Sequence, residues 1–468
     1  MQLPIVDTAP IVAQHGPQFR WLFQNKCQFR HFQNYLTGLT VLDNKTMANI
    51  TRCLLDSADK SNLSRFFSKA KWSSAEVNTH RLEYMLQETS KQRRSAKHSV
   101  LPIDDTLCEH VGNLFEYVDK HYNHGDGSYP LAHNLVTAHY VSGAVRFPVD
   151  FRLYRRYEEC TQWETFVEKH FPTETIPKQK KARAKFRRQV EPTLLADDEF
   201  CLLHDAFQTK ITLAIELVEY ALTNELPFAT VLFDSWYLAP ALLAVLKQHD
   251  KNWISILKMN RNVLTNSFVL KDADGQPILF EKSKIQVKDL IPFIPATAFK
   301  PVVVDGNTYY YFSKNVRLSS LGKVRLVISF DNPECKGTCV VLVTNCLSWS
   351  AQKIIATYLL RWPIETFYQD IKQHLGLDDY RMRDMKAIQK HWSLVFVAYS
   401  FLHLDCLPNS NGQKSTFPSK SLGQAVRQQG RFVIEALILH AHRLISQGQS
   451  AHDVFASIFA KQRCSLAL

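Results

Sequence analysis

The chain has 468 residues, 46% of them hydrophobic, and a formal net charge of +12 at pH 7. These values exclude a disordered chain and favour a globular protein of two or three domains whose partner is a polyanion, nucleic acid ahead of an anionic membrane. No apolar run reaches the roughly 18 residues of a membrane helix, and the N-terminus lacks the basic and apolar regions of a signal peptide. The 10 cysteines are scattered, as expected of reduced thiols in a cytoplasm.

Residues 1–95 are predicted to form a helical DNA-binding domain. Phe29–Leu42 has apolar residues at helical spacing, and Lys45–Leu55 and Ser61–Ser68 are predicted to be two short helices around a polar turn, with a serine as N-cap of the second. Such a pair is either a helix-turn-helix with its second helix in a major groove or part of an ordinary helical bundle. The basic run Lys91–His98 is predicted to be a solvated linker or a hinge that touches phosphates.

From residue 99 the pattern changes to strands. The apolar segment SVLPID leads into Asp104-Asp105-Thr106, and residues 135–149 give two strand-like runs around Ser142-Gly143, a hairpin signature. Acidic residues at the end of a strand, followed by a hairpin, are typical of the start of an RNase H-like sheet. The alternative for Asp-Asp-Thr is an ordinary turn or cap.

A basic run and a second strand with an acid at its end follow. The run contains Lys178, Lys180, Lys181, Arg183, Lys185, Arg187 and Arg188. It is either a solvated face or a DNA-phosphate contact. After a predicted amphipathic helix at Phe207–Leu222, the apolar run ATVLFD ends in Asp234, at the carboxyl end of a buried strand where α/β ligand sites lie. The alternative for Asp234 is a helix N-cap, since a helix is predicted at Leu238–Gln248.

Residues 260–339 are predicted to be a β-strand insertion domain, because helical periodicity disappears there and Asp-Gly and Gly-Asn turns separate apolar runs. Tyr309, Tyr310, Tyr311 and Phe312 could stack on an extruded base. The alternative is a strand whose tyrosines are alternately buried and exposed. The run Val340–Asn345 is expected to rejoin the main sheet.

The stretch YLLRWPIETFYQDIK follows the pattern Tyr-x2-Arg-x3-Glu-x6-Lys, with Tyr358, Arg361, Glu365 and Lys372 at its fixed positions. At about 100° per residue, a straight helix would carry all four within an arc of about 60°. One carboxylate, two cations and a phenol on one face suit a divalent metal together with a phosphate. Pro363 would kink this helix. The alternative is an exposed helix with an Arg361–Glu365 ion pair.

This pattern resembles the signature of the DDE transposases of bacterial insertion sequences, specifically the IS-four-like family. The segment Phe-Asp-Ser-Trp-Tyr around Asp234 is similar to that family's second-aspartate segment. The resemblance implies an α/β RNase H-like core with catalytic, metal-binding acids Asp105, Asp234 and Glu365, and Asp104 is the rival of Asp105. It also implies that Tyr358, Arg361 and Lys372 contact DNA phosphates, and that the β-rich insertion contacts the transposon end.

Two Mg²⁺ ions, which Mn²⁺ could replace, would neutralise three converging carboxylates and activate water for phosphodiester cleavage. The expected domains are 1–95, a core at 96–259 and 340–405, the insertion at 260–339, and a helical region at 406–468. Within them, Trp392–Leu404 is expected to be a core helix and Val426–Ser446 a helix that supports dimer contacts.

The predicted protein is a cytoplasmic, nucleoid-associated transposase that binds terminal inverted repeats in double-stranded DNA, cleaves the transposon ends and joins them to target DNA as a homodimer, without a membrane partner. The alternatives are a metal-dependent nuclease without strand transfer and a domesticated DNA-binding descendant.

Overall fold

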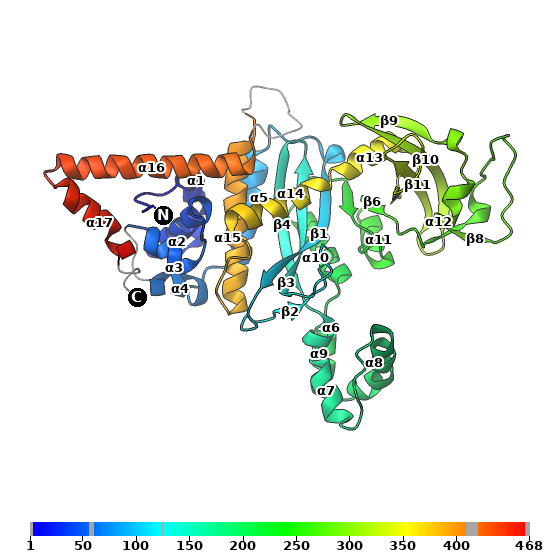
Figure 1. Ribbon diagram of the computed structural model, residues 1–468, viewed down its shortest axis with the longest axis horizontal. Coiled ribbons are helices and arrows are strands. Elements are labelled where there is room, and N and C mark those ends of the chain that lie inside the picture. Colours follow the sequence, from blue (N-terminus) through cyan, green and yellow to red (C-terminus); the bar gives the residue numbers. More distant parts are fainter. Residues whose placement is uncertain (1–2, 56–59, 124, 409–419, 464–468) are drawn as a thin grey trace.

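The computed structural model describes residues 3–55, 60–123, 125–408 and 420–463. Within these ranges the protein is a mixed α/β structure, with a long sheet flanked by helices (Figure 1). None of the helices described is both long and apolar enough to cross a membrane.

The described strands form one mixed sheet of 12 strands with the order β2-β3-β1-β5-β6-β12-β11-β10-β7-β8, in which β4 pairs with β3 and β9 with β10. Their bounds are β1 Val100–His110, β2 Asp119–Lys120, β3 Leu131–Ser142, β4 Val145–Tyr154, β5 Thr230–Phe233, β6 Asn252–Ile256, β7 Asn262–Leu264, β8 Lys284–Gln286, β9 Lys300–Val304, β10 Asn307–Leu318, β11 Gly322–Phe330 and β12 Val340–Thr344. The β1–β5 and β5–β6 pairs are parallel, and the other pairs are antiparallel.

The helices lie on both faces of the sheet and at its two ends (Figure 1). The α-helices are α1 Pro10–His15, α2 Lys26–Val41, α3 Met47–Cys53, α4 Lys60–Ser68, α5 Ser74–Glu88, α6 Tyr157–Cys160, α7 Trp163–His170, α8 Lys180–Leu194, α9 Asp198–Asp205, α10 Lys210–Thr223, α11 Pro240–Gln248, α12 Val287–Leu290, α13 Ala351–Leu359, α14 Trp362–Leu375, α15 Met385–Cys406, α16 Leu422–Ser446 and α17 Ala451–Arg463.

The hairpin predicted around Ser142-Gly143 is confirmed, since β3 and β4 pair on either side of it and Gly143 has φ 67°. The prediction that β1 ends at its aspartates is wrong. Asp104 and Asp105 lie inside β1, paired with Thr137 and Val136 of β3. Neither acid is therefore a turn or cap residue, and their side chains leave opposite faces of the strand.

Each face of β1 packs on a different group of helices. Leu101 and Ile103 share a core with Leu213 of α10. Val100 instead shares a core with Ile354 of α13 and with Leu232 of β5. Because side chains alternate along a strand, odd-numbered residues of this part of β1 face α10 and even-numbered residues face α13.

The segment predicted as a separate β insertion continues the main sheet. β12 pairs with β6 on one side and with β11 on the other, so Val340–Thr344 joins the sheet as expected. Tyr309, Tyr310 and Tyr311 of β10 are all half-buried, whereas Phe312 is buried in the core that contains Leu213 of α10. The expected alternation of buried and exposed tyrosines along this strand is therefore not found.

Residues 157–205 form a helical projection that the sequence pattern did not predict. Helices α6 to α9 extend away from the sheet (Figure 1) around a core of their own, which includes Trp163, Phe166, Val190 and Phe200. The basic run lies on this projection, because α8 contains most of it.

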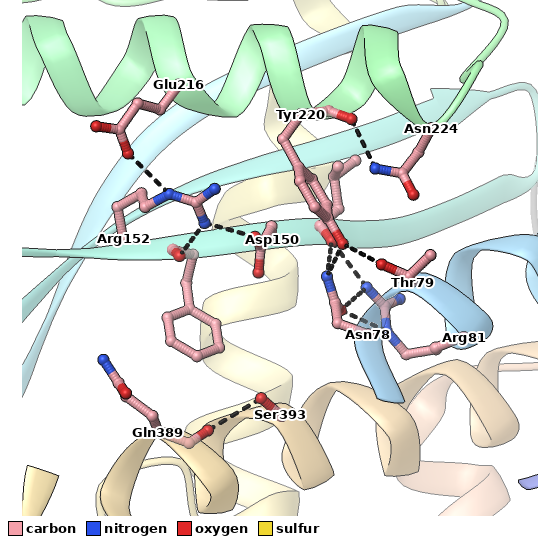
Figure 2. Close-up of polar contacts among 12 residues, drawn as sticks. Asn78, Thr79, Arg81, Asp150, Arg152, Glu216, Tyr220, Asn224, Gln389 and Ser393 are labelled. Atoms are coloured by element: carbon pink, nitrogen blue, oxygen red, sulfur yellow. Dashed lines mark hydrogen bonds and ion pairs between the residues drawn. The ribbon is translucent and has the colours of Figure 1, made fainter. Parts of the chain in front are cut away.

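The N-terminal helices share a core with α14 and α15. Arg81 of α5 is fully buried, and it donates to Asn78 Oδ1, to the Val149 carbonyl oxygen of β4 and to Ser400 Oγ of α15. Figure 2 shows the Asn78 and Arg81 part of this network beside a second network, in which Arg152 of β4 contacts Asp150 of the same strand and Glu216 of α10. Together the two networks connect α5, β4, α10 and α15 by specific hydrogen bonds.

The predicted helix pair exists as α3 and α4, while the turn at 56–59 lies outside the described residues. Ser61 lies inside α4, so the prediction that this serine caps the helix is wrong. The other predicted helices are present with shifted ends, as α2, α10, α11, α15 and α16.

Candidate active site

The Tyr-Arg-Glu-Lys stretch is two helices, so the prediction of one helix with all four side chains on one arc is wrong. Helix α13 ends at Leu359, and Arg361 is the N-cap residue of α14. Pro363 lies in the first turn of α14, where a proline costs no hydrogen bond and its fixed φ suits a helix start. Tyr358 and Glu365 therefore belong to different helices that meet at Arg361.

Arg361 connects two acids from different elements. Its Nη1 donates to Asp104 Oδ2 at 2.5 Å, and its Nη2 donates to Glu365 Oε1. Burial raises the pKa of Asp104 to about 7, with the charges of Asp105 and Asp234 adding to the rise and Arg361 opposing it. Asp104 is thus an acid that is costly to ionise, and the Arg361 guanidinium favours its charged form.

Asp105, the sequence-based choice for the first acid, lies on the opposite face of β1 from Glu365. It accepts from Lys210 Nζ of α10 at 2.7 Å and from the Tyr237 hydroxyl at 2.9 Å. Burial first, and then the charges of Asp105 and Asp104, raise the pKa of Tyr237, which therefore stays protonated and donates. The structure brings Asp104, and not Asp105, to the helix that carries Glu365.

Asp234 directly follows β5, as predicted. The parallel register pairs Pro102 of β1 with Leu232 of β5, and Asp104 and Asp234 each lie two residues further along their strands. Asp234 Oδ1 accepts from the Trp236 backbone N–H at 2.8 Å. Its side chain therefore orders the loop at the carboxyl end of β5.

Tyr358 contacts Arg361, whereas Lys372 contacts the backbone of β1. The Tyr358 ring centre lies 5.9 Å from the Arg361 guanidinium carbon, and burial raises the pKa of Tyr358, so that its hydroxyl remains a donor. Lys372 Nζ donates to the Leu107 carbonyl oxygen of β1 at 2.6 Å. Lys372 therefore lies against β1 with its ammonium on a backbone oxygen.

The basic run divides into exposed and engaged cations. Arg183 donates to Glu158 at 2.6 Å and lies over the Trp163 ring, and Arg187 lies over the Tyr157 ring. The remaining five cations are exposed: Lys178, Lys180, Lys181, Lys185 and Arg188. Only these five present their charge to solvent, because the two arginines contribute to packing of the projection.

The three carboxylates fit a divalent metal by chemical type, since carboxylate oxygens are the ligands that hard cations prefer. In the described part of the chain, however, no group of three or more His, Cys, Asp or Glu side chains is close enough to hold an ion. Asp104 and Glu365 instead share the Arg361 guanidinium. A metal at these acids would have to replace Arg361 or bind beside it.

Comparison with known proteins defines the class of protein. The model described as "DDE superfamily endonuclease" matches residues 18–277, which is more than half of the chain, and the chain belongs to this family. A second model, "Archaeal putative transposase ISC1217", matches residues 202–415, so the two matches together include all three predicted acid segments. The two family descriptions indicate an enzyme that cleaves DNA, and DDE superfamily nucleases generally use divalent metals.

No curated protein matches the sequence. Among solved structures, the crystal structure of the NurA nuclease from Sulfolobus solfataricus is 12% identical and covers 62% of this chain and 86% of that chain, with a TM-score of 0.19. A similarity this low supports no conclusion about this chain.

Sequence reasoning missed three residues beside the acids, namely Lys210, Trp236 and Tyr237. Two of them follow Asp234 in Phe-Asp-Ser-Trp-Tyr, and aromatic residues so close to a candidate acid were an available signal. Lys210 gave no local signal, because its contact with Asp105 spans 105 positions of the sequence.

Proposed function

We propose that the protein is a DNA transposase that cleaves the ends of an insertion sequence and transfers the 3′ ends into target DNA. The observation that carries this proposal is the sharing of Arg361 between Asp104 and Glu365, beside Asp234, in a chain of the DDE endonuclease family. We infer that Asp104, in place of Asp105, acts as the first acid together with Asp234 and Glu365. Asp104 is on the face of β1 that packs towards α13 and α14, whereas Asp105 is neutralised by Lys210 on the other face.

These acids would hold two Mg²⁺ ions, or Mn²⁺ in their place, which would activate the attacking oxygen and stabilise the leaving one. Arg361, once released from the carboxylates, has a planar donor group suited to a phosphate. The protonated Tyr358 hydroxyl can donate to a second phosphate oxygen. Lys372 is a third phosphate contact in this proposal, provided that its ammonium leaves the Leu107 carbonyl.

The organisation expected for this function is an RNase H-like core. The order β4-β3-β1-β5-β6, with β1–β5 and β5–β6 parallel, supports it. We infer that the N-terminal helices and the strands after β6 bind the transposon end and that the cytoplasmic protein acts on the nucleoid.

Joining two ends requires two active sites, so we also infer a homodimer on DNA. The long helix α16 exposes Ile434, Ile438 and Ile445, which offers an apolar surface for a second copy.

The test uses oligonucleotide duplexes that carry the inverted repeats found on either side of the gene. With Mg²⁺, a transposase yields both cleaved ends and products joined to target DNA. Cleavage without joined products would identify a nuclease, and binding without cleavage would identify a DNA-binding descendant; either result would overturn the proposal.

A further inference from the structure

Trp236 is an exposed aromatic side chain held next to a candidate active-site acid. It lies two residues after Asp234, and 56% of it is exposed. Its backbone N–H donates to Asp234 Oδ1 at 2.8 Å, so the segment that carries the indole is fixed relative to that carboxylate. An indole left in solvent at such a position has a large flat surface available for a ligand.

Two ammonium groups from separate elements lie near the Trp236 ring. Lys210 Nζ of α10 is 5.9 Å from the ring centre, and Lys258 Nζ, from the segment after β6, is 5.6 Å from it. Lys210 is also paired with Asp105, whereas Lys258 is exposed. Both ammonium groups lie over the exposed indole ring. The site therefore has the two features that bind a nucleotide, namely an aromatic surface for the base, which would take the place of an ammonium group, and positive charge for its phosphates.

Lys258 also lines a cavity of about 430 Å³. Arg261, Ser319 and Ser320 also line it, together with two asparagines. Guanidinium, ammonium, amide and hydroxyl groups all donate hydrogen bonds to phosphate oxygens. The cavity therefore adds further phosphate-binding groups next to Lys258.

We propose that Trp236 is a stacking platform for one unpaired nucleobase of the DNA strand next to the scissile phosphate, with the following phosphate held by Lys258 and Arg261. This inference rests on the proposed function, because Trp236 lies next to the scissile phosphate only if Asp234 is a metal-binding acid. Bases inside a duplex stack on each other, so the bound nucleotide must be unpaired or extruded. The platform accepts any base, since every base has an aromatic face.

The test measures binding to a 20-base-pair duplex with a four-nucleotide single-stranded 3′ overhang, with 2-aminopurine at each overhang position in turn, in EDTA. Trp236→Ala should bind about 5-fold to 150-fold more weakly than the wild type, the loss expected for one base–aromatic stack. At one overhang position the wild type should quench 2-aminopurine emission, and Trp236→Ala should not. Trp236→Phe should retain most of the affinity and the quenching.

Tyr129→Ala is the control, because Tyr129 is a 64% exposed aromatic residue that precedes β3 and is not assigned to DNA binding. It should bind as the wild type does. Equal binding by Trp236→Ala and Tyr129→Ala, with equal quenching, would overturn the platform. If Trp236 proves necessary for binding but the wild type cuts no DNA with Mg²⁺, the platform stands and the proposed transposase activity is wrong.

Discussion

The two neighbouring aspartates of β1 should respond oppositely when each is replaced by asparagine. Asp104 has a pKa of about 7 in place of 3.8, mainly because it is buried. A carboxyl with a raised pKa in the folded state holds its proton more tightly there than in the unfolded chain. Its effect on stability therefore becomes more unfavourable as pH rises from about 4 to about 7. Above pH 7 the ionised Asp104 lowers the free energy of unfolding by at most about 4 kcal/mol, because each unit of pKa difference corresponds to about 1.4 kcal/mol.

Asparagine cannot ionise, so Asp104→Asn should raise the free energy of unfolding at pH 8 by up to about 4 kcal/mol, and by less at pH 5. Asp105 instead accepts hydrogen bonds from Lys210 and Tyr237. The Asp105 side chain is 23% exposed and the Lys210 side chain 15% exposed. Asp105→Asn should therefore lower the free energy of unfolding by about 1–3 kcal/mol, the value of a charged hydrogen bond in a partly buried site.

Urea unfolding in EDTA at pH 5 and pH 8 measures the stability changes, and cleavage of labelled ends with Mg²⁺ measures activity. Asp104→Asn should abolish cleavage, as should Asp234→Asn and Glu365→Gln, whereas Asp105→Asn should retain part of it. An Asp104→Asn protein that is less stable than the wild type at pH 8 would refute the assignment of the pKa to burial. Full cleavage by Asp104→Asn, with none by Asp105→Asn, would restore Asp105 as the first acid.

Three further predictions address the rest of the chain. Burial lowers the pKa of His391 to about 4, so folding favours its neutral form and the protein loses stability as pH drops below about 6.5. Between pH 7.5 and pH 5.5 the free energy of unfolding, measured in urea, should therefore fall by about 1.4 kcal/mol more in the wild type than in His391→Gln. Replacing Lys181, Lys185 and Arg188 by alanine should reduce the salt slope of DNA binding by up to about three units, whereas Arg183→Ala should lower the melting temperature with little effect on that slope. Ile438→Lys should shift the DNA complex from two copies to one in light scattering, and an unchanged mass would exclude α16 from the dimer interface.

Local patterns predicted much of the fold because many elements carry their own signals. The β3–β4 hairpin has a Ser-Gly turn, and the strand before Asp234 is a short apolar run bounded by a polar loop. Helix α15 has a long buried run from Trp392. In each of these segments the residues that decide the structure are neighbours in the sequence.

The choice between Asp104 and Asp105 required tertiary information. Both faces of β1 are buried, so residues 100–103 are all apolar and show no alternation that distinguishes the faces. Only the packing of α10 on one face and α13 on the other shows which acid faces Glu365. The break before α14 was more accessible, because a proline is favoured in the first turn of a helix and Pro363 could have been interpreted as a start.

Arg361 should couple metal binding to DNA binding. Its guanidinium neutralises both Asp104 and Glu365, so a divalent ion that uses both acids competes with it. If an ion took the place of Arg361 at these acids, the guanidinium would become available for a phosphate. Metal and DNA should then strengthen each other's binding by a common factor, with couplings of this kind typically about 5-fold to 150-fold.

Calorimetric titration of Mn²⁺, with and without a pre-cleaved end, measures this factor directly. Arg361→Ala should bind Mn²⁺ more tightly than the wild type in the absence of DNA, because the competitor is gone, and its affinity should no longer increase when DNA is added. Lys372→Ala is the control, since Lys372 donates to the Leu107 carbonyl and neutralises neither acid; its Mn²⁺ affinity without DNA should equal that of the wild type, while its DNA binding weakens. If Arg361→Ala binds Mn²⁺ as the wild type does and keeps the full coupling, the ion binds beside the guanidinium, and Arg361 is a fixed partner of the two acids throughout the reaction.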